Sequence, residues 1–120
     1  APASEALLMA LKVAEADVKM PIIEALGNTR DPAALNVLLA MGEDQSLDEA
    51  TRLAALRAAK VTLGALNTVD KMVYNDLVAL LDDPSDAIRQ ASAACLAAGP
   101  FSAEQIVTVL AEKKVLAPSK

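Results

Sequence analysis

The residue types that most often carry out catalysis are scarce in this chain of 120 residues. It has no histidine and one cysteine, Cys95, which stands among alanines. Without imidazole, neither a Ser-His or Cys-His catalytic unit nor a usual transition-metal site can be assembled. The alanine-rich setting favours an inert, buried thiol. The acidic pairs Glu43-Asp44 and Asp82-Asp83 lack the alternating ligand spacing of an EF-hand. We therefore predict a protein that is not an enzyme and that holds no metal and no cofactor.

One set of side chains has the spacing of a binding surface instead. Glu49, Leu53, Arg57 and Lys60 share a narrow sector of a helical wheel. An exposed leucine between charged residues is typical of a modest protein-binding surface, although the same pattern also suits an ordinary solvated helix face. The pattern therefore leaves two interpretations open, an ordinary solvated face and a surface where a protein partner contacts Leu53, Arg57 and Lys60.

The charge balance excludes other classes of ligand. A net charge of −5 argues against nucleic acid as the main partner, because phosphate backbones are bound by clustered Lys and Arg. No apolar run approaches the roughly 20 residues that a membrane span requires. We expect a soluble protein, with no membrane partner, and leave open a cytoplasmic or, after signal cleavage, an extracytoplasmic location.

The composition predicts an all-α protein. Hydrophobic residues make up 54% of the chain but aromatic residues only 2%, so the core must consist of Ala, Leu, Val and Ile on closely packed helices. Helical periodicity and capping signals predict seven helices. They cover residues 4–15, 18–26, 32–41, a segment from Ser46 or Asp48 to about 63, 69–81, 84–98, and a last segment up to about 112. We place one domain at 4–116, with loose termini at 1–3 and 117–120.

Capping residues and glycines define the predicted helix ends. Ser4, Asp31, Asp83 and Ser102 are expected to be N-caps, with Pro32 and Pro84 at the first helical position and Gln105 completing a capping box. Glycines near helix ends commonly adopt a left-handed conformation. We therefore interpret all four glycines as helix ends, at Gly27, Gly42, Gly64 and Gly99.

The helices form an internal repeat. Aligning the segments that begin at Val18, Thr51 and Ile88 places Lys19, Arg52 and Arg89 in register, 33 and 37 residues apart. Periods of this size are typical of helical solenoids. Arg52 lies on the apolar side of its predicted helix, which favours pairing with a neighbouring carboxylate or carbonyl that sets the register of adjacent repeats, and Arg89 is similar.

These segments resemble the HEAT-repeat family, most closely its short phycobilisome-lyase-type repeats. That pattern is a helix with V-R-x-x-A-x-x-A-L-G followed by G-D-P-x-A-V-x-x-L. Residues 18–39 match both halves, 83–96 match the beginning of a repeat, and 51–59 match more loosely. Lys19 stands where Arg is usual, and Ser46 replaces the usual Asp six residues before Arg52. The resemblance implies a right-handed α-solenoid of about three helical pairs.

The resemblance also implies roles for individual residues. The second helix of each pair would form the inner wall, which would place five partner-binding residues near a groove: Lys19, Leu53, Arg57, Lys60 and Gln90. Arg52, Asp83 and Arg89 would form a polar ladder between repeats. We expect a non-catalytic protein-interaction or scaffolding module. Two alternatives remain, a bilin lyase or its accessory subunit, and a structural segment of a longer HEAT array.

Overall fold

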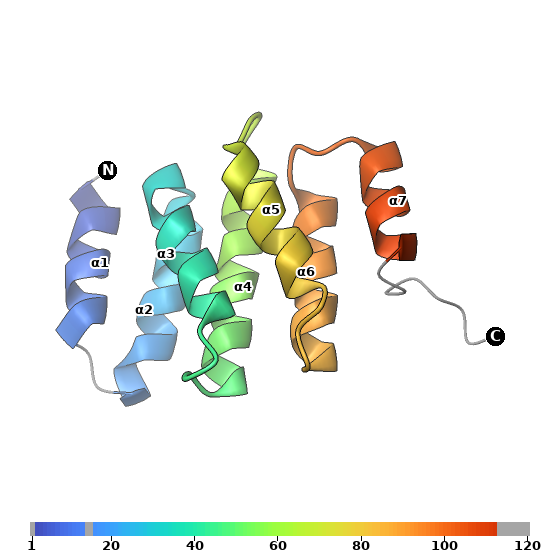
Figure 1. Cartoon of the computed structure of the whole chain (residues 1–120). Helices are drawn as coiled ribbons and strands as arrows, with labels where there is room; N and C mark the ends of the chain where they lie inside the picture. The colour runs from blue at the N-terminus through green and yellow to red at the C-terminus, as the bar shows by residue number, and fades with distance from the viewer. Residues whose placement is uncertain (1, 14–15, 113–120) are drawn as a thin grey trace.

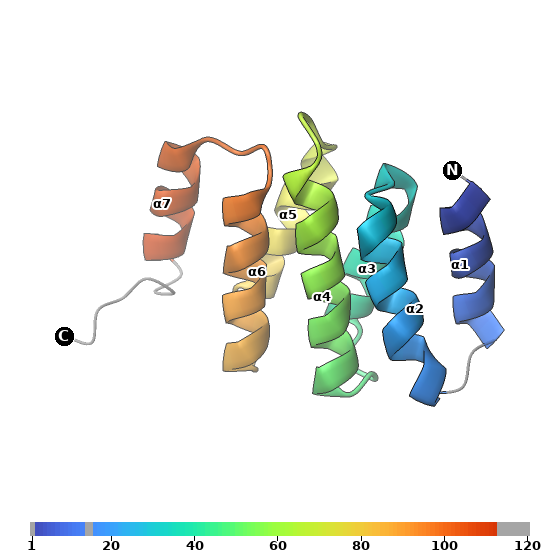
Figure 2. The same ribbon diagram turned by 180° about the vertical axis from the view of Figure 1, so that it is seen from behind.

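The computed structural model describes residues 2–13 and 16–112 of the chain. Within these ranges it contains seven helices and no strand. They are α1 (Pro2–Val13), α2 (Ala16–Thr29), α3 (Pro32–Glu43), α4 (Glu49–Gly64), α5 (Lys71–Leu80), α6 (Asp86–Ala98) and α7 (Ala103–Glu112). Successive helices run in opposite directions, so α2, α4 and α6 lie side by side and parallel in one layer (Figures 1 and 2). Helices α3 and α5 form a second layer against α4 and α6, and the predicted α-solenoid is confirmed.

The ends of the first two helices differ from the prediction. Helix α1 begins at Pro2, so Ser4 lies inside the helix and is not its N-cap. Helix α2 continues past Gly27 to Thr29 and ends where Arg30 takes a left-handed backbone conformation, with φ of 54°. The predicted domain end at residue 116 lies outside the described residues.

The later caps are a mixture of correct and wrong predictions. Asp31 accepts a hydrogen bond from the Ala33 amide at 3.0 Å, and Ser102 accepts one from the Gln105 amide at 3.0 Å, both as predicted. The prediction that Asp83 caps the sixth helix is wrong. Helix α6 begins at Asp86, and its N-cap is Ser85. The Asp83 carboxylate is therefore available for another contact.

The left-handed conformation predicted for the glycines is wrong, although Gly64 ends α4 and Gly99 is the C-cap of α6, as predicted. No glycine has a positive φ, and Arg30 is the one residue in the described ranges that does. Gly27 lies inside α2, where an added Cβ would be 2.8 Å from the Cα of Ala58 on α4. Gly42 lies inside α3, where an added Cβ would be 2.6 Å from a methyl carbon of Leu56. These two glycines allow neighbouring helices to approach closely.

Helix α4 is the centre of the core. Its residues Ala55, Leu56, Ala59 and Leu63 are fully buried, and α2, α3 and α6 pack around it. Thr62 is also buried and donates its hydroxyl proton to the Ala58 carbonyl at 3.2 Å, so that its polar group is satisfied within the helix. Because three neighbours fix α4, the side chains on its remaining exposed face have a rigid support.

Candidate interaction surface

A shallow groove lies between α4 and α6, two helices that stand side by side in Figure 2. Both walls consist mainly of aliphatic side chains with a few polar ones. Its lining comprises Leu53, Leu56, Arg57 and Lys60 on α4, and Ala87, Gln90, Ala91 and Ala94 on α6. Four of the five partner-binding residues predicted from the sequence, Leu53, Arg57, Lys60 and Gln90, are therefore brought together by the fold.

The charge of this groove is opposite to that of the whole chain. Arg57 and Lys60 are exposed, and no carboxylate contributes to the lining. An adjoining hollow contains Arg30, Arg57 and Lys60 beside Gly64 and Ala98, again without a carboxylate. Within the described ranges none of these three cations forms an ion pair with a carboxylate. A protein of net charge −5 thus presents a basic, partly apolar surface.

Part of this basic character has a structural explanation. Helices α2, α4 and α6 run in the same direction, so their C-termini lie at the same end of the layer (Figure 2). Helix C-termini carry a negative partial charge that favours nearby cations. This accounts for Arg30 and Lys60, which lie at or within about one turn of a helix end. Arg57 precedes Gly64 by about two turns, beyond the range of that effect. Arg57 forms no ion pair with a carboxylate among the described residues, although Glu24 lines the hollow between α2 and α4 together with it.

Arg30 was not predicted from the sequence. The interpretation of Gly27 as the end of the second helix placed Arg30 in a loop, whereas α2 continues for two further residues. A cation directly before the Asp31-Pro32 capping signal was the available clue.

Lys19 does not belong to the groove. It is half-buried on α2, on the stripe that carries Ile23 and Leu26, and both of those side chains are fully buried. The hollow between α2 and α4 is lined from α2 by Met20, Pro21, Glu24 and Asn28 instead. Lys19 thus occupies the position equivalent to Arg52, on the core-facing side of its helix.

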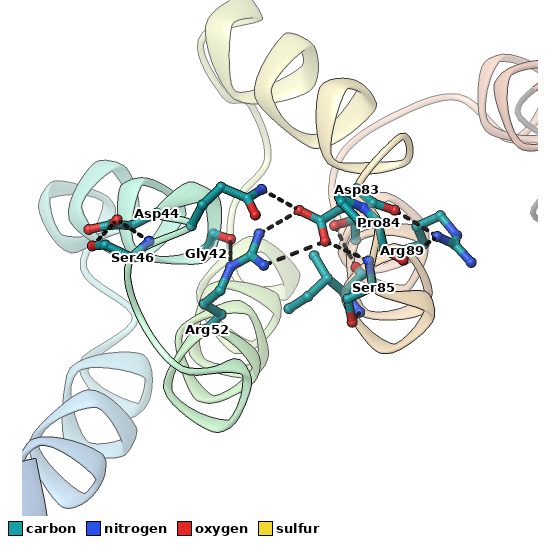
Figure 3. A network of polar contacts seen from close by, with 11 residues as sticks. Gly42, Asp44, Ser46, Arg52, Asp83, Pro84, Ser85 and Arg89 are labelled. Carbon is teal, nitrogen blue, oxygen red and sulfur yellow. Dashed lines mark hydrogen bonds and ion pairs between the residues drawn. The ribbon is translucent and has the colours of Figure 1, made fainter.

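Arg52 and Asp83 form the centre of a polar network (Figure 3). The Arg52 Nη2 atom lies 2.6 Å from Asp83 Oδ1, and the two side chains are only 6% and 2% exposed. The Arg52 Nε–H group donates to the Gly42 carbonyl at 2.9 Å. Asp83 also accepts from the Gln45 amide at 2.9 Å and from the Ser85 backbone N–H at 2.9 Å. One buried ion pair therefore connects α3, α4 and the loop before α6.

The protonation of Asp83 follows from these contacts. Burial alone would raise the pKa of its carboxyl group. The hydrogen bonds from Arg52, Ser85 and Gln45, together with the Arg52 charge, outweigh burial and lower the pKa below its ordinary value. Asp83 is therefore ionised at neutral pH, as an ion pair with Arg52 requires.

Arg89 contacts its own repeat. Its Nη1 atom donates to the Asp83 backbone carbonyl at 2.6 Å and to the Pro84 carbonyl at 3.1 Å, and its Nη2 atom pairs with Asp86 at 3.1 Å. Arg52, Asp83 and Arg89 are thus connected. The Asp83 carboxylate pairs with Arg52 of the preceding repeat, whereas Arg89 binds backbone carbonyls in the loop before its own helix. At the position equivalent to Asp83, Ser46 donates to Asp44 at 2.6 Å.

Cys95 has the surroundings of an inert thiol. It is fully buried on α6 and donates to the Leu56 carbonyl of α4 at 3.2 Å. Burial raises the pKa of its thiol to about 12, so the nucleophilic thiolate is essentially absent near neutral pH. Among the residues of known placement, no group of three or more His, Cys, Asp or Glu side chains could hold a metal ion.

Stacked antiparallel helix pairs with one continuous core define the class of helical repeat proteins. A family model described as HEAT repeats matches residues 4–97, and the chain belongs to that family. HEAT repeats are commonly protein-interaction modules and generally non-catalytic scaffolds. No curated protein and no solved structure matches the chain. None of the helices in the described ranges combines the length and apolar character that a bilayer span requires.

Proposed function

We propose that this protein is a non-catalytic interaction module that binds a partner protein through the groove between α4 and α6. The observation that carries the proposal is the position of Arg57. It is exposed beside the partly buried Leu53, it pairs with no carboxylate among the described residues, and it lies too far from a helix end to serve the helix dipole.

Binding at this groove has a simple physical basis. A partner that covers Leu53 and the alanines of α6 removes apolar surface from water, which supplies the favourable free energy. Arg57 and Lys60 at the edge of the groove attract carboxylates of the partner, which accelerates association and fixes its register. Gln90 on the opposite wall offers both a donor and an acceptor.

Affinity capture from the native source, quantified by mass spectrometry, tests this proposal. We expect a partner that the wild type retains and that the Arg57→Glu/Lys60→Glu variant loses. The matched control is Lys12→Glu/Lys71→Glu, which makes the same change in net charge at two exposed lysines on α1 and α5. Circular dichroism establishes that both variants are folded. The proposal is wrong if the groove variant retains every partner.

A further inference from the structure

Two of the three hollows that α4 lines, the one toward α6 and the one beside Gly64, join into one groove. Arg57 and Lys60 line both of them, and the combined lining extends along α4 from Leu53 to Gly64 and along α6 from Ala87 to Ala98. At 1.5 Å per residue, the length along α4 is about 17 Å, or three helical turns. The described chain offers no sheet edge to which an extended segment could add as a strand. A helix of three to four turns is therefore the shape that fits this groove.

The two walls of the groove have the same polarity. Helices α4 and α6 run in the same direction, so their C-termini, at Gly64 and Ala98, meet at one end (Figure 2). That end carries the negative partial charge of two helix dipoles, and the opposite end carries the positive partial charge. A bound helix is favoured when its own N-terminus lies at the Gly64 end, antiparallel to both walls.

Side-chain charges along the groove select the same orientation. Arg30 and Lys60 lie toward the Gly64 end and Arg57 lies between the two ends, whereas Glu49, one turn before Leu53 on the same stripe, lies at the other end. Acidic side chains near the N-terminus of a bound helix would meet these cations and would also favour its own dipole. With a parallel helix, carboxylates that reached the cations would lie at its C-terminus, where its dipole opposes them.

The geometry points to an amphipathic partner helix that binds antiparallel to α4 and α6, with acidic side chains in its first two turns and basic ones in its last. This inference rests on the proposed function and names the chemistry of the partner. Helices α4, α6 and α7 have an acidic residue in the first turn but no basic residue in the last. Helix α1 has Glu5 in its first turn and Lys12 in its last, so binding of a second copy of this chain is one outcome that the test must distinguish.

Two synthetic 15-residue peptides of identical composition test the inference. Both carry Leu and Ala on one face; the forward peptide has Glu in its first two turns and Lys in its last two, and the reversed peptide exchanges them. We expect the forward peptide to bind with about tenfold lower Kd in fluorescence anisotropy, because two or three exposed charge pairs contribute a factor of that order. Arg57→Glu/Lys60→Glu should abolish the difference, Lys12→Glu/Lys71→Glu should keep it, and added salt should reduce it.

A spin label on the N-terminus of the forward peptide tests the orientation separately. We expect it to broaden the amide NMR signals of Gly64 and Ala98 much more strongly than those of Leu53 and Ala87. Stronger broadening at Leu53 and Ala87, or equal affinity of the two peptides, overturns the inference.

Two further outcomes separate the inference from the proposed function. If neither peptide binds while the captured native partner still depends on Arg57 and Lys60, the groove binds protein and the helical partner is wrong. If light scattering shows a dimer of the chain that Arg57→Glu/Lys60→Glu dissociates, the groove belongs to a second copy, and the inference is likewise overturned.

Discussion

Helix α4 contacts two neighbours in its own layer, and the two junctions are built differently. Toward α2, the contact depends on Gly27, whose missing side chain lets the two backbones approach at Ala58. Toward α6, the contact depends on the buried ion pair between Arg52 and the Asp83 loop, and on the hydrogen bond from Cys95 to the Leu56 carbonyl. One junction is defined by shape and the other by polar groups.

The difference shows two ways in which a repeat protein sets the register of adjacent repeats. A close backbone contact buries no charge, but it tolerates no side chain at the glycine. A buried ion pair must offset the desolvation of two charges, so it contributes more to a defined register than to net stability. Removing only one of its partners, however, leaves an uncompensated charge in the core.

The largest effect is expected at the polar junction. We predict that Asp83→Ala lowers the free energy of unfolding by about 3–5 kcal/mol, because Arg52 is then buried without a counter-ion. Urea unfolding followed by circular dichroism measures the change. The double variant Arg52→Met/Asp83→Ala should recover a substantial part of the loss, because the uncompensated charge is removed. Equal stability of the single and double variants would contradict the assignment of the effect to that charge.

At the shape-defined junction we predict a loss of about 1–3 kcal/mol for Gly27→Val, the usual range for overpacking a close contact. The matched control is Gly64→Ala, where an added Cβ meets nothing within 4 Å. We expect this variant to be unchanged or more stable by up to about 1 kcal/mol, since alanine has the higher helix propensity. Thermal unfolding compares the two variants, and equal losses would show that helix packing does not distinguish the two positions.

A smaller effect is expected from the second contact of the polar junction. We predict that Cys95→Ala costs about 1–2 kcal/mol, through the lost sulfur packing and the lost hydrogen bond to Leu56. In the native wild type, the raised thiol pKa and full burial should prevent reaction with a disulfide reagent at pH 8 until the protein unfolds. Rapid labelling of the folded protein would show that this junction opens.

The smallest expected effect is a pH dependence of stability that comes from the polar junction and not from the glycine contact. The pKa of Asp83 is lower in the folded protein than the roughly 3.9 of an unfolded aspartate. Its stabilising contribution is therefore complete above the unfolded value and is lost as the pH falls through the folded value. Acid titrations of stability should show a steeper loss in the wild type than in Arg52→Met/Asp83→Ala. Identical profiles would mean that other carboxylates dominate acid unfolding.

The sequence predicted the two junctions unequally. Helical periodicity and the Asp-Pro and Ser-Gln caps located all seven helices to within a few residues, because these signals are local. The role of Gly27 was missed, because a glycine near the end of an apolar pattern has the same local signature whether it ends a helix or contacts another one. Asp83 was expected both to cap its helix and to join a ladder. The Asp83 side chain pairs with Arg52 instead of capping the helix, and this contact spans 31 residues of sequence.

The groove residues were also predicted from local periodicity, and the prediction again failed where a contact between helices decides the position. Leu53, Arg57 and Lys60 share one helix face, so periodicity alone grouped them. Gln90 followed from the resemblance to the repeat family, which also assigned Lys19 to the groove. Lys19 lies instead in the register position of Arg52, facing the core. Periodicity defines the face of one helix, but only packing decides which faces of two helices meet.

The left-handed backbone of Arg30 places a strained residue beside the basic hollow. A non-glycine residue in that conformation costs about 1–2 kcal/mol. Glycine adopts this conformation without that cost, so Arg30→Gly would relieve the strain. The arginine lines the basic hollow next to Arg57 and Lys60. Arg30→Gly would therefore exchange a positive charge of this hollow for relief of backbone strain.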